Sequence, residues 1–113
     1  MPDMRLIVVA ATLLAACAQT PQPPKSCGLT SADQWFAMTN ADLTGNHDFQ
    51  VFMAEVEDGQ LKPAASTMGF VAAVANLAMA ETALADGEPG RACLLLKQVR
   101  ADPRLPIQFR PIQ

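Results

Sequence analysis

Apolar residues follow two different patterns along this chain. Residues 6–16 form one apolar run, whereas after residue 30 apolar side chains recur at intervals of three and four positions. Such intervals place side chains on one face of an α-helix, while a strand alternates at every second residue. The chain is therefore predicted to be all-α, with a small bundle of three to four short helices after a signal peptide and a proline-rich tether.

The first predicted helix covers roughly residues 32–39. Thr30 or Ser31 suits its N-cap, and Gln34 stands three residues after Ser31, as in a capping box. This helix brings Trp35 into contact with the core. The polar stretch "TNADLTGNHD" that follows is interpreted as a turn region.

A second helix is predicted after this turn, closed by "EDG". The apolar positions at i, i+3, i+4 and i+7 are Phe49, Phe52, Met53 and Val56. A strand over 49–56 would instead place Phe49, Val51 and Met53 on one face. Both alternatives stay open, and the helix is preferred.

The longest predicted helix lies between Pro63 and Gly87. Proline suits a first helical turn and glycine suits the position after the last one. Its apolar stripe consists of Phe70, Val74, Leu77 and Leu84. The many alanines permit close helix approach, and Gly69 is interpreted as the site of a tight crossing.

A final helix is predicted from Arg91 to Ala101, and Asp102-Pro103 ends it. Its inward side chains are Ala92, Leu95, Leu96 and Val99. The helix pair within 63–103 resembles a single tetratricopeptide-type hairpin. The matching points are Ala80, Gly87, Ala92, Asp102 and Pro103. This resemblance implies a groove that binds a peptide or a protein.

The chain starts with the layout of a secretory signal peptide, predicted to cover residues 1–16. A short charged start precedes the apolar run, and small residues follow it. A helix that spans the hydrocarbon core of a bilayer needs roughly 20 residues, so the run is too short for a permanent span. Translation from Met4 instead of Met1 would leave Arg5 without the nearby Asp3, and both starts remain open.

The end of this segment, Leu14-Ala15-Ala16-Cys17, resembles the lipobox of bacterial lipoproteins. The resemblance implies cleavage before Cys17, diacylation of its thiol, and acylation of the new amine. Two or three acyl chains attach a protein firmly to a membrane. Ala18 follows where inner-membrane lipoproteins carry Asp, which favours the outer membrane, facing the periplasm. The alternative is an ordinary signal peptide in which Cys17 falls there by chance.

Residues 17–26 are predicted to form the lipid-anchored linker, since Pro21, Pro23 and Pro24 favour an extended chain. The helical domain is predicted over 27–103 and an extended C-terminal tail over 104–113. Cys27 and Cys93 are the two cysteines left after lipidation. In an oxidising exported compartment they are expected to form one disulfide. Closing a loop of about 66 residues would contribute about 4 kcal/mol. An intermolecular bridge is the alternative.

The tail "LPIQFRPIQ" carries prolines that exclude a regular helix. Its apolar side chains are Leu105, Ile107, Phe109 and Ile112. Such a segment either packs back over the helices or docks on a partner. In the second case the partner-binding residues are Phe109, Ile107, Arg104 and Arg110.

Charge is distributed unevenly, although the net charge is −3. Residues 17–90 hold nine acidic and two basic side chains, whereas residues 91–113 hold five basic ones and one acid. The basic end neutralises the acidic body or serves as an interaction tail. The overall balance argues against a nucleic-acid partner, because such proteins carry a dense basic face.

The sequence contains no recognisable catalytic constellation. His47, the only histidine, stands in the polar stretch and is interpreted as a solvated residue. Oxygen-bearing side chains around Gly45 suggest a calcium loop, but Val51 occupies the position where such a loop needs a bidentate Glu. We therefore expect no enzyme activity, no metal, no cofactor and no small-molecule substrate.

Together these observations predict a small outer-membrane-anchored periplasmic lipoprotein. Its expected role is to bind or brace another envelope protein, as an accessory component of a secretion, conjugation or pilus assembly. The alternative is a periplasmic inhibitor or exclusion lipoprotein that blocks an enzyme or a transfer apparatus. An apolar groove beside the C-terminal tail would favour the first role, and a protruding loop that presents one side chain would favour the second.

Overall fold

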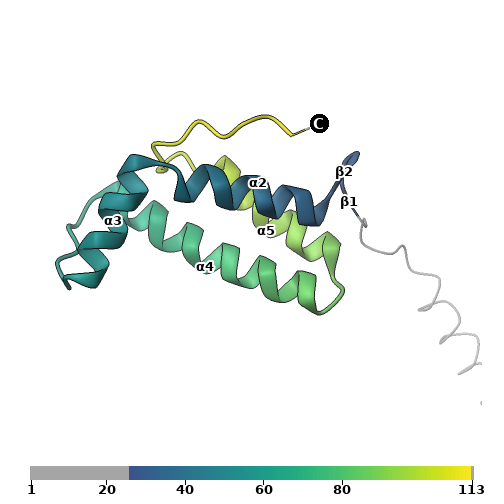
Figure 1. Cartoon of the computed structure of the whole chain (residues 1–113), viewed down its shortest axis with the longest axis horizontal. Coiled ribbons are helices and arrows are strands. Elements are labelled where there is room, and N and C mark those ends of the chain that lie inside the picture. The colour runs from purple at the N-terminus through teal and green to yellow at the C-terminus, as the bar shows by residue number, and fades with distance from the viewer. Residues whose placement is uncertain (1–25, 113) are drawn as a thin grey trace, which may run out of the picture.

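The structure, a computed structural model, describes residues 26–112. Within this range four helices follow a short pair of strands (Figure 1). The elements are β1 (Ser26–Cys27), β2 (Thr30–Ser31), α2 (Ala32–Thr44), α3 (His47–Glu57), α4 (Ala65–Ala85) and α5 (Pro89–Ala101). The predicted all-α bundle is confirmed, while the signal peptide, Cys17 and the tether up to residue 25 lie outside the described residues.

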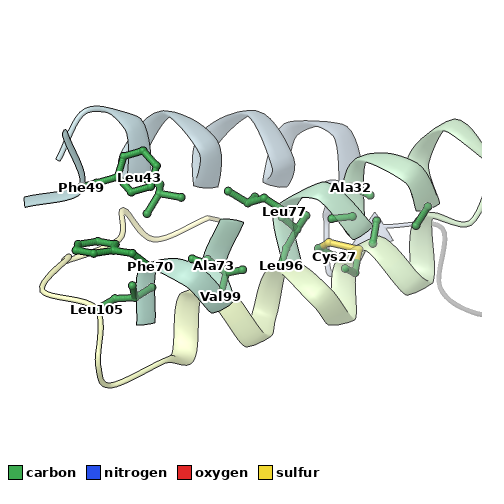
Figure 2. Close-up of a cluster of buried hydrophobic side chains, with 14 of the residues drawn as sticks. Cys27, Ala32, Leu43, Phe49, Phe70, Ala73, Leu77, Leu96, Val99 and Leu105 are labelled. Carbon is green, nitrogen blue, oxygen red and sulfur yellow. A yellow bond between two sulfur atoms is a disulfide. The ribbon is translucent and has the colours of Figure 1, made fainter. Parts of the chain in front are cut away.

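Helices α2, α4 and α5 lie side by side, and α3 extends from one end of this layer (Figure 1). The apolar core runs between the three long helices (Figure 2). At one end of the core, the rings of Phe49, Phe52 and Phe70 lie with centroids 5.3–5.9 Å apart. The rest of the core is built mostly from small side chains, so the helices approach closely.

The strands close the other end of the core. Cys27 pairs with Thr30 in the antiparallel register, and Gly28 in the turn has a φ of 77°, a conformation that favours glycine. Cys27 and Cys93 form a disulfide with an S–S distance of 2.02 Å and a Cα–Cα distance of 5.4 Å. The predicted intramolecular bond is therefore present, and it joins the entry of the domain to α5 (Figure 2).

Helix α2 begins where the sequence indicates but ends later. The Ser31 hydroxyl accepts a hydrogen bond from the backbone N–H of Gln34 at 3.2 Å, which identifies Ser31 as the N-cap. The prediction that the helix ends near residue 39 and that a polar turn follows is wrong, because the helix continues to Thr44. Thr39 and Leu43 are both buried on its inner face, and no glycine or proline interrupts the helix before Gly45.

Helix α3 confirms the helical alternative for residues 49–56. Asn46 caps it, since its side-chain oxygen accepts from the N–H of Phe49 at 3.1 Å. Phe49 and Phe52 are buried, whereas Met53 and Val56 are exposed. Only half of the predicted stripe meets the core because α3 contacts the other helices at one end.

Helices α4 and α5 form the predicted antiparallel hairpin, joined by a turn in which Gly87 has a φ of 73°. On α5, Ala92, Leu96 and Val99 are buried and Leu95 is half-buried. On α4 the prediction for Val74 is wrong, because this side chain is 41 % exposed. The buried face of α4 consists of Gly69, Phe70, Ala73, Leu77, Ala80 and Ala83. Alanines are preferred there since they let α5 approach closely.

The tail folds back after α5 and runs along α2 (Figure 1). Leu105 is buried, while Ile107 and Phe109 are half-buried against the core. A Cβ placed on Gly69 would lie 3.0 Å from the Arg104 Cβ and 3.2 Å from the Leu105 Cδ2. The tight crossing predicted at Gly69 is therefore real, and the chain that crosses it is the start of the tail rather than a helix.

Candidate functional site

Arg100, in the last turn of α5, joins two helices to the tail. Its guanidinium carbon lies 5.5 Å from the centroid of the Trp35 ring and 5.1 Å from that of Phe109. The Nη1 group donates to the Thr39 hydroxyl at 3.1 Å, and Nη2 donates to the carbonyl of Arg110. We call Arg100 with Trp35, Thr39 and Phe109 the Arg100 clasp. A planar cation between two aromatic rings suits arginine better than lysine.

The electrostatics of the Arg100 clasp are set by its partial burial. Burial lowers the pKa of the Arg100 guanidinium, the Asp42 carboxylate raises it, and the nearby Arg110 lowers it. The group remains a cation at neutral pH because the pKa of arginine lies far above 7. The clasp is therefore a permanent positive contact and not a pH switch.

A second attachment holds the tail about one turn further along α2. The Asp42 carboxylate accepts from the backbone N–H of Arg110 at 3.0 Å and from its Nε at 2.6 Å. Asn46 adds a hydrogen bond from its Nδ2 to the carbonyl of Pro106 at 3.4 Å. The basic end of the chain thus neutralises an acid of the body, in line with one of the two interpretations of the uneven charge.

Beside the end of the tail the surface is hollowed into a groove of about 390 Å³. We call this the tail groove; it is lined by Leu29, Thr30, Gln34, Ala37, Met38, Pro111 and Ile112. Leu29, at the tip of the β1–β2 turn, is 99 % exposed. Most of these side chains are apolar, and Gln34 supplies an amide. Such a lining suits an apolar side chain or an extended segment of another protein.

The structure places the site residues that the sequence predicts as follows. Cys17 lies outside the described residues, and Cys27 and Cys93 are bonded to each other. Of the four candidate partner-binding residues, Ile107 and Phe109 pack partly on the core. Arg104 pairs with Asp102 at 2.8 Å and Arg110 pairs with Asp42. The tail packs back over the helices, and Ile107 and Phe109 are half-buried, whereas Arg104 and Arg110 are exposed.

His47 is the first residue of α3 and is exposed. The stretch interpreted as a turn, and as a defective calcium loop, is helical up to Thr44, so its oxygen-bearing side chains do not converge as in such a loop. Within residues 26–112 no group of three or more His, Cys, Asp or Glu side chains is placed to hold a metal ion.

Sequence reasoning missed Arg100 and Leu29. Arg100 carries no local signal, since a basic residue in the last turn of a helix is ordinary. Leu29 does carry a local signal. It is an apolar residue directly after a glycine, in a short turn between a cysteine and a helix cap, and no neighbour in that turn can cover its side chain.

No family model matches this sequence, and no curated protein or solved structure is found to be similar to it.

Proposed function

We propose that this chain is a lipid-anchored envelope protein whose helical body binds and braces another envelope protein through the tail groove. The anchor is Cys17, in the lipobox-like segment that ends the apolar run. The location is the outer membrane, facing the periplasm, and the role is non-enzymatic. The partner supplies an apolar segment, because most of the groove lining is apolar and uncharged.

The tail groove is the observation that carries this proposal. It lies beside the C-terminal tail, whose Pro111 and Ile112 form part of its lining, and an apolar groove at this place favours the scaffold role. Its shape is held by three constraints: the disulfide at Cys27, the Ser31 cap, and the attachment of Arg110 to Asp42. A rigid site loses little conformational freedom on binding, which favours affinity.

The position of the groove also fits an anchored protein. Eight residues separate Cys17 from Ser26, where the described chain starts. An extended chain spans at most about 3.5 Å per residue, so this tether limits the body to roughly 30 Å from the acylated cysteine. Leu29 is three residues further on, so an anchor at Cys17 would keep the groove at the end of the body that is closer to the bilayer.

Photo-crosslinking tests the proposal. A photoreactive amino acid replaces Met38 in the groove, and the matched control carries it at Glu57, an exposed position on α3. We expect one discrete adduct with an envelope protein from position 38 and none from position 57. Intact-mass analysis of the purified protein checks the anchor, since acylation must disappear in Cys17→Ser. Equal labelling from both positions, or an unmodified N-terminus in the wild type, contradicts the proposal.

The inhibitor alternative retains support from one observation, the full exposure of Leu29 on a turn braced by the disulfide. Inhibitors of enzymes present such side chains on rigid loops. The same crosslinking separates the two roles. A photoreactive group at Leu29 that captures an enzyme, whose activity rises in Leu29→Ala cells, favours the inhibitor over the scaffold.

A further inference from the structure

Helix α4 has an apolar outer face that nothing in the described chain covers. The side chains of Met68, Val71 and Met79 are 57 %, 43 % and 44 % exposed. The α4 outer face, as we call it, consists of Met68, Val71, Ala72, Ala75, Ala78, Met79 and Thr82. Glu81 is the only charged residue in the 21 residues of α4. By length and composition α4 qualifies as a candidate membrane span, although its opposite face packs in the core.

The spacing along this face is that of a helix-pairing seam. Its positions follow one another by three and four residues over two heptads, from Met68 through Ala75 to Thr82. The one polar group is already satisfied, because the Thr82 hydroxyl donates to the Ala78 carbonyl at 3.1 Å. Alanines at the middle of the seam would let a second helix approach closely.

We propose that the α4 outer face binds the same face of a second copy of this chain, with the two α4 helices antiparallel. A two-fold axis at Ala75 places Val71 of one copy opposite Met79 of the other, and Met68 opposite Thr82. The surface is then complementary to itself: an uncharged face meets an uncharged face. A partner with a charged face would have to bury its charges without compensation.

Charge at the two ends of α4 selects the antiparallel orientation. Lys62 precedes the helix but pairs with Glu55 of its own chain at 3.9 Å, so the partial positive charge at this end comes from the unpaired N–H groups of the first turn. Asp86 and Glu88 follow its C-terminal end, and Glu88 pairs with Arg91 at 3.6 Å, so the negative charge at this end comes from Asp86 and the unpaired carbonyls of the last turn. An antiparallel pair brings these opposite ends together, whereas a parallel pair would bring like charges together.

The same acids argue against a bilayer as the occupant. Helices that lie on membranes carry lysine and arginine beside their apolar face, and α4 contains neither. Glu81 flanks its outer face, and the anionic lipid surface would repel it. The surface is also separate from the tail groove, since the end of the tail, which lines that groove, runs along α2, and the start of the tail meets α4 at Gly69 on its buried face (Figure 1).

Thiol crosslinking of the full chain tests this pairing. Single variants Ala75→Cys, Val71→Cys and Met79→Cys are treated with a short thiol-to-thiol crosslinker in broken cells. Val51→Cys, on α3 and as exposed as Val71, is the matched control, and the wild type reports any reaction of Cys17. We expect a product of twice the chain mass from Ala75→Cys and none from Val51→Cys.

The register gives a second readout. In the antiparallel pair, the two copies of residue 71 lie about 12 Å apart along the axis, at 1.5 Å per residue. A thiol at 71 should therefore couple to a thiol at 79 in mixed cells but not to itself. Adding Ala75→Glu, which places two carboxylates on the axis, should reduce that mixed product at least tenfold.

Three results would overturn the second-copy proposal: no dimer from Ala75→Cys, a dimer of equal yield from Val51→Cys, or a product of a different mass. A product of a different mass would identify another protein or a lipid-bound species on α4. Groove crosslinking from position 38 should continue in the Ala75→Glu variant, so a failure of the pairing remains distinct from a failure of the proposed function.

Discussion

Asp42 on α2 and Arg110 in the tail lie 68 positions apart in the sequence and share two hydrogen bonds, one through the backbone and one through the side chain. The Asp42 side chain is 12 % exposed and that of Arg110 is 57 % exposed. This pair fixes the tail on α2 two residues before Ile112, which lines the groove. The groove and the attachment of the tail are therefore coupled.

Substitution of Asp42→Asn should release the end of the tail. A partly exposed ion pair with a hydrogen bond to the backbone contributes about 1 kcal/mol, so the domain should remain folded. Hydrogen exchange at the Arg110 amide measures the release, which should be at least several-fold faster. Glu57→Gln, which removes an exposed carboxylate of α3, is the control. An unchanged exchange rate in Asp42→Asn would show that Arg110 is held by other contacts.

Substitution of Gly69→Ala should destabilise the protein by about 1–2 kcal/mol, despite the better helix propensity of alanine. The reason is the distance of 3.0 Å between the new Cβ and the Arg104 Cβ. Urea unfolding followed through Trp35, the only tryptophan, measures the change. Ala54→Gly on the exposed side of α3 is the control, where glycine should be the worse residue by about 1 kcal/mol. Stabilisation by Gly69→Ala would contradict the close approach of the tail.

Removal of the disulfide by Cys27→Ser with Cys93→Ser should cost about 4 kcal/mol, since the bond closes a loop of 66 residues. Much of the remaining core consists of alanines, which bury little area each, so the reduced domain should be only marginally stable. Thermal unfolding with and without reductant checks this for the wild type. A melting temperature that does not change on reduction would contradict this contribution.

Asp102 should make the free energy of unfolding depend on pH under acidic conditions. The hydrogen bonds from the Arg104 side chain and backbone lower the pKa of the Asp102 carboxyl in the folded state. A carboxyl whose pKa is lowered in the folded state stabilises the fold at pH values above the pKa of the unfolded state. This contribution is lost as the pH falls through the pKa of the folded state. Asp102→Asn should therefore be less stable than wild type at pH 7, and the difference should shrink at an acidic pH below the ordinary carboxyl pKa. Denaturant titrations at both pH values measure the difference, which should be smaller in acid.

Parts of the site and fold were predictable from short stretches of sequence. Ser31 is recognisable as an N-cap candidate because capping depends on the residues that follow it directly. Gly69 is recognisable as a crossing because a close approach of two segments needs the smallest residue. The tail residues Ile107 and Phe109 were recognised as apolar, but not which surface they would meet. Phe109 meets the guanidinium of Arg100, which also lies over the ring of Trp35, a residue 65 positions before Arg100, and no local pattern marks this contact.

Local sequence patterns predicted the helix pair within residues 63–101, the availability of Cys27 and Cys93 to each other, and a tail that is not helical, while a strand stayed open for residues 49–56. These properties follow from local periodicity, from the count of thiols and from prolines. Tertiary packing determines which face of α4 is buried, because that helix is apolar nearly all round and its periodicity favours no face. It also decided that α2 extends through a polar stretch, since burial of Thr39 and Leu43 outweighs the local preference for a turn.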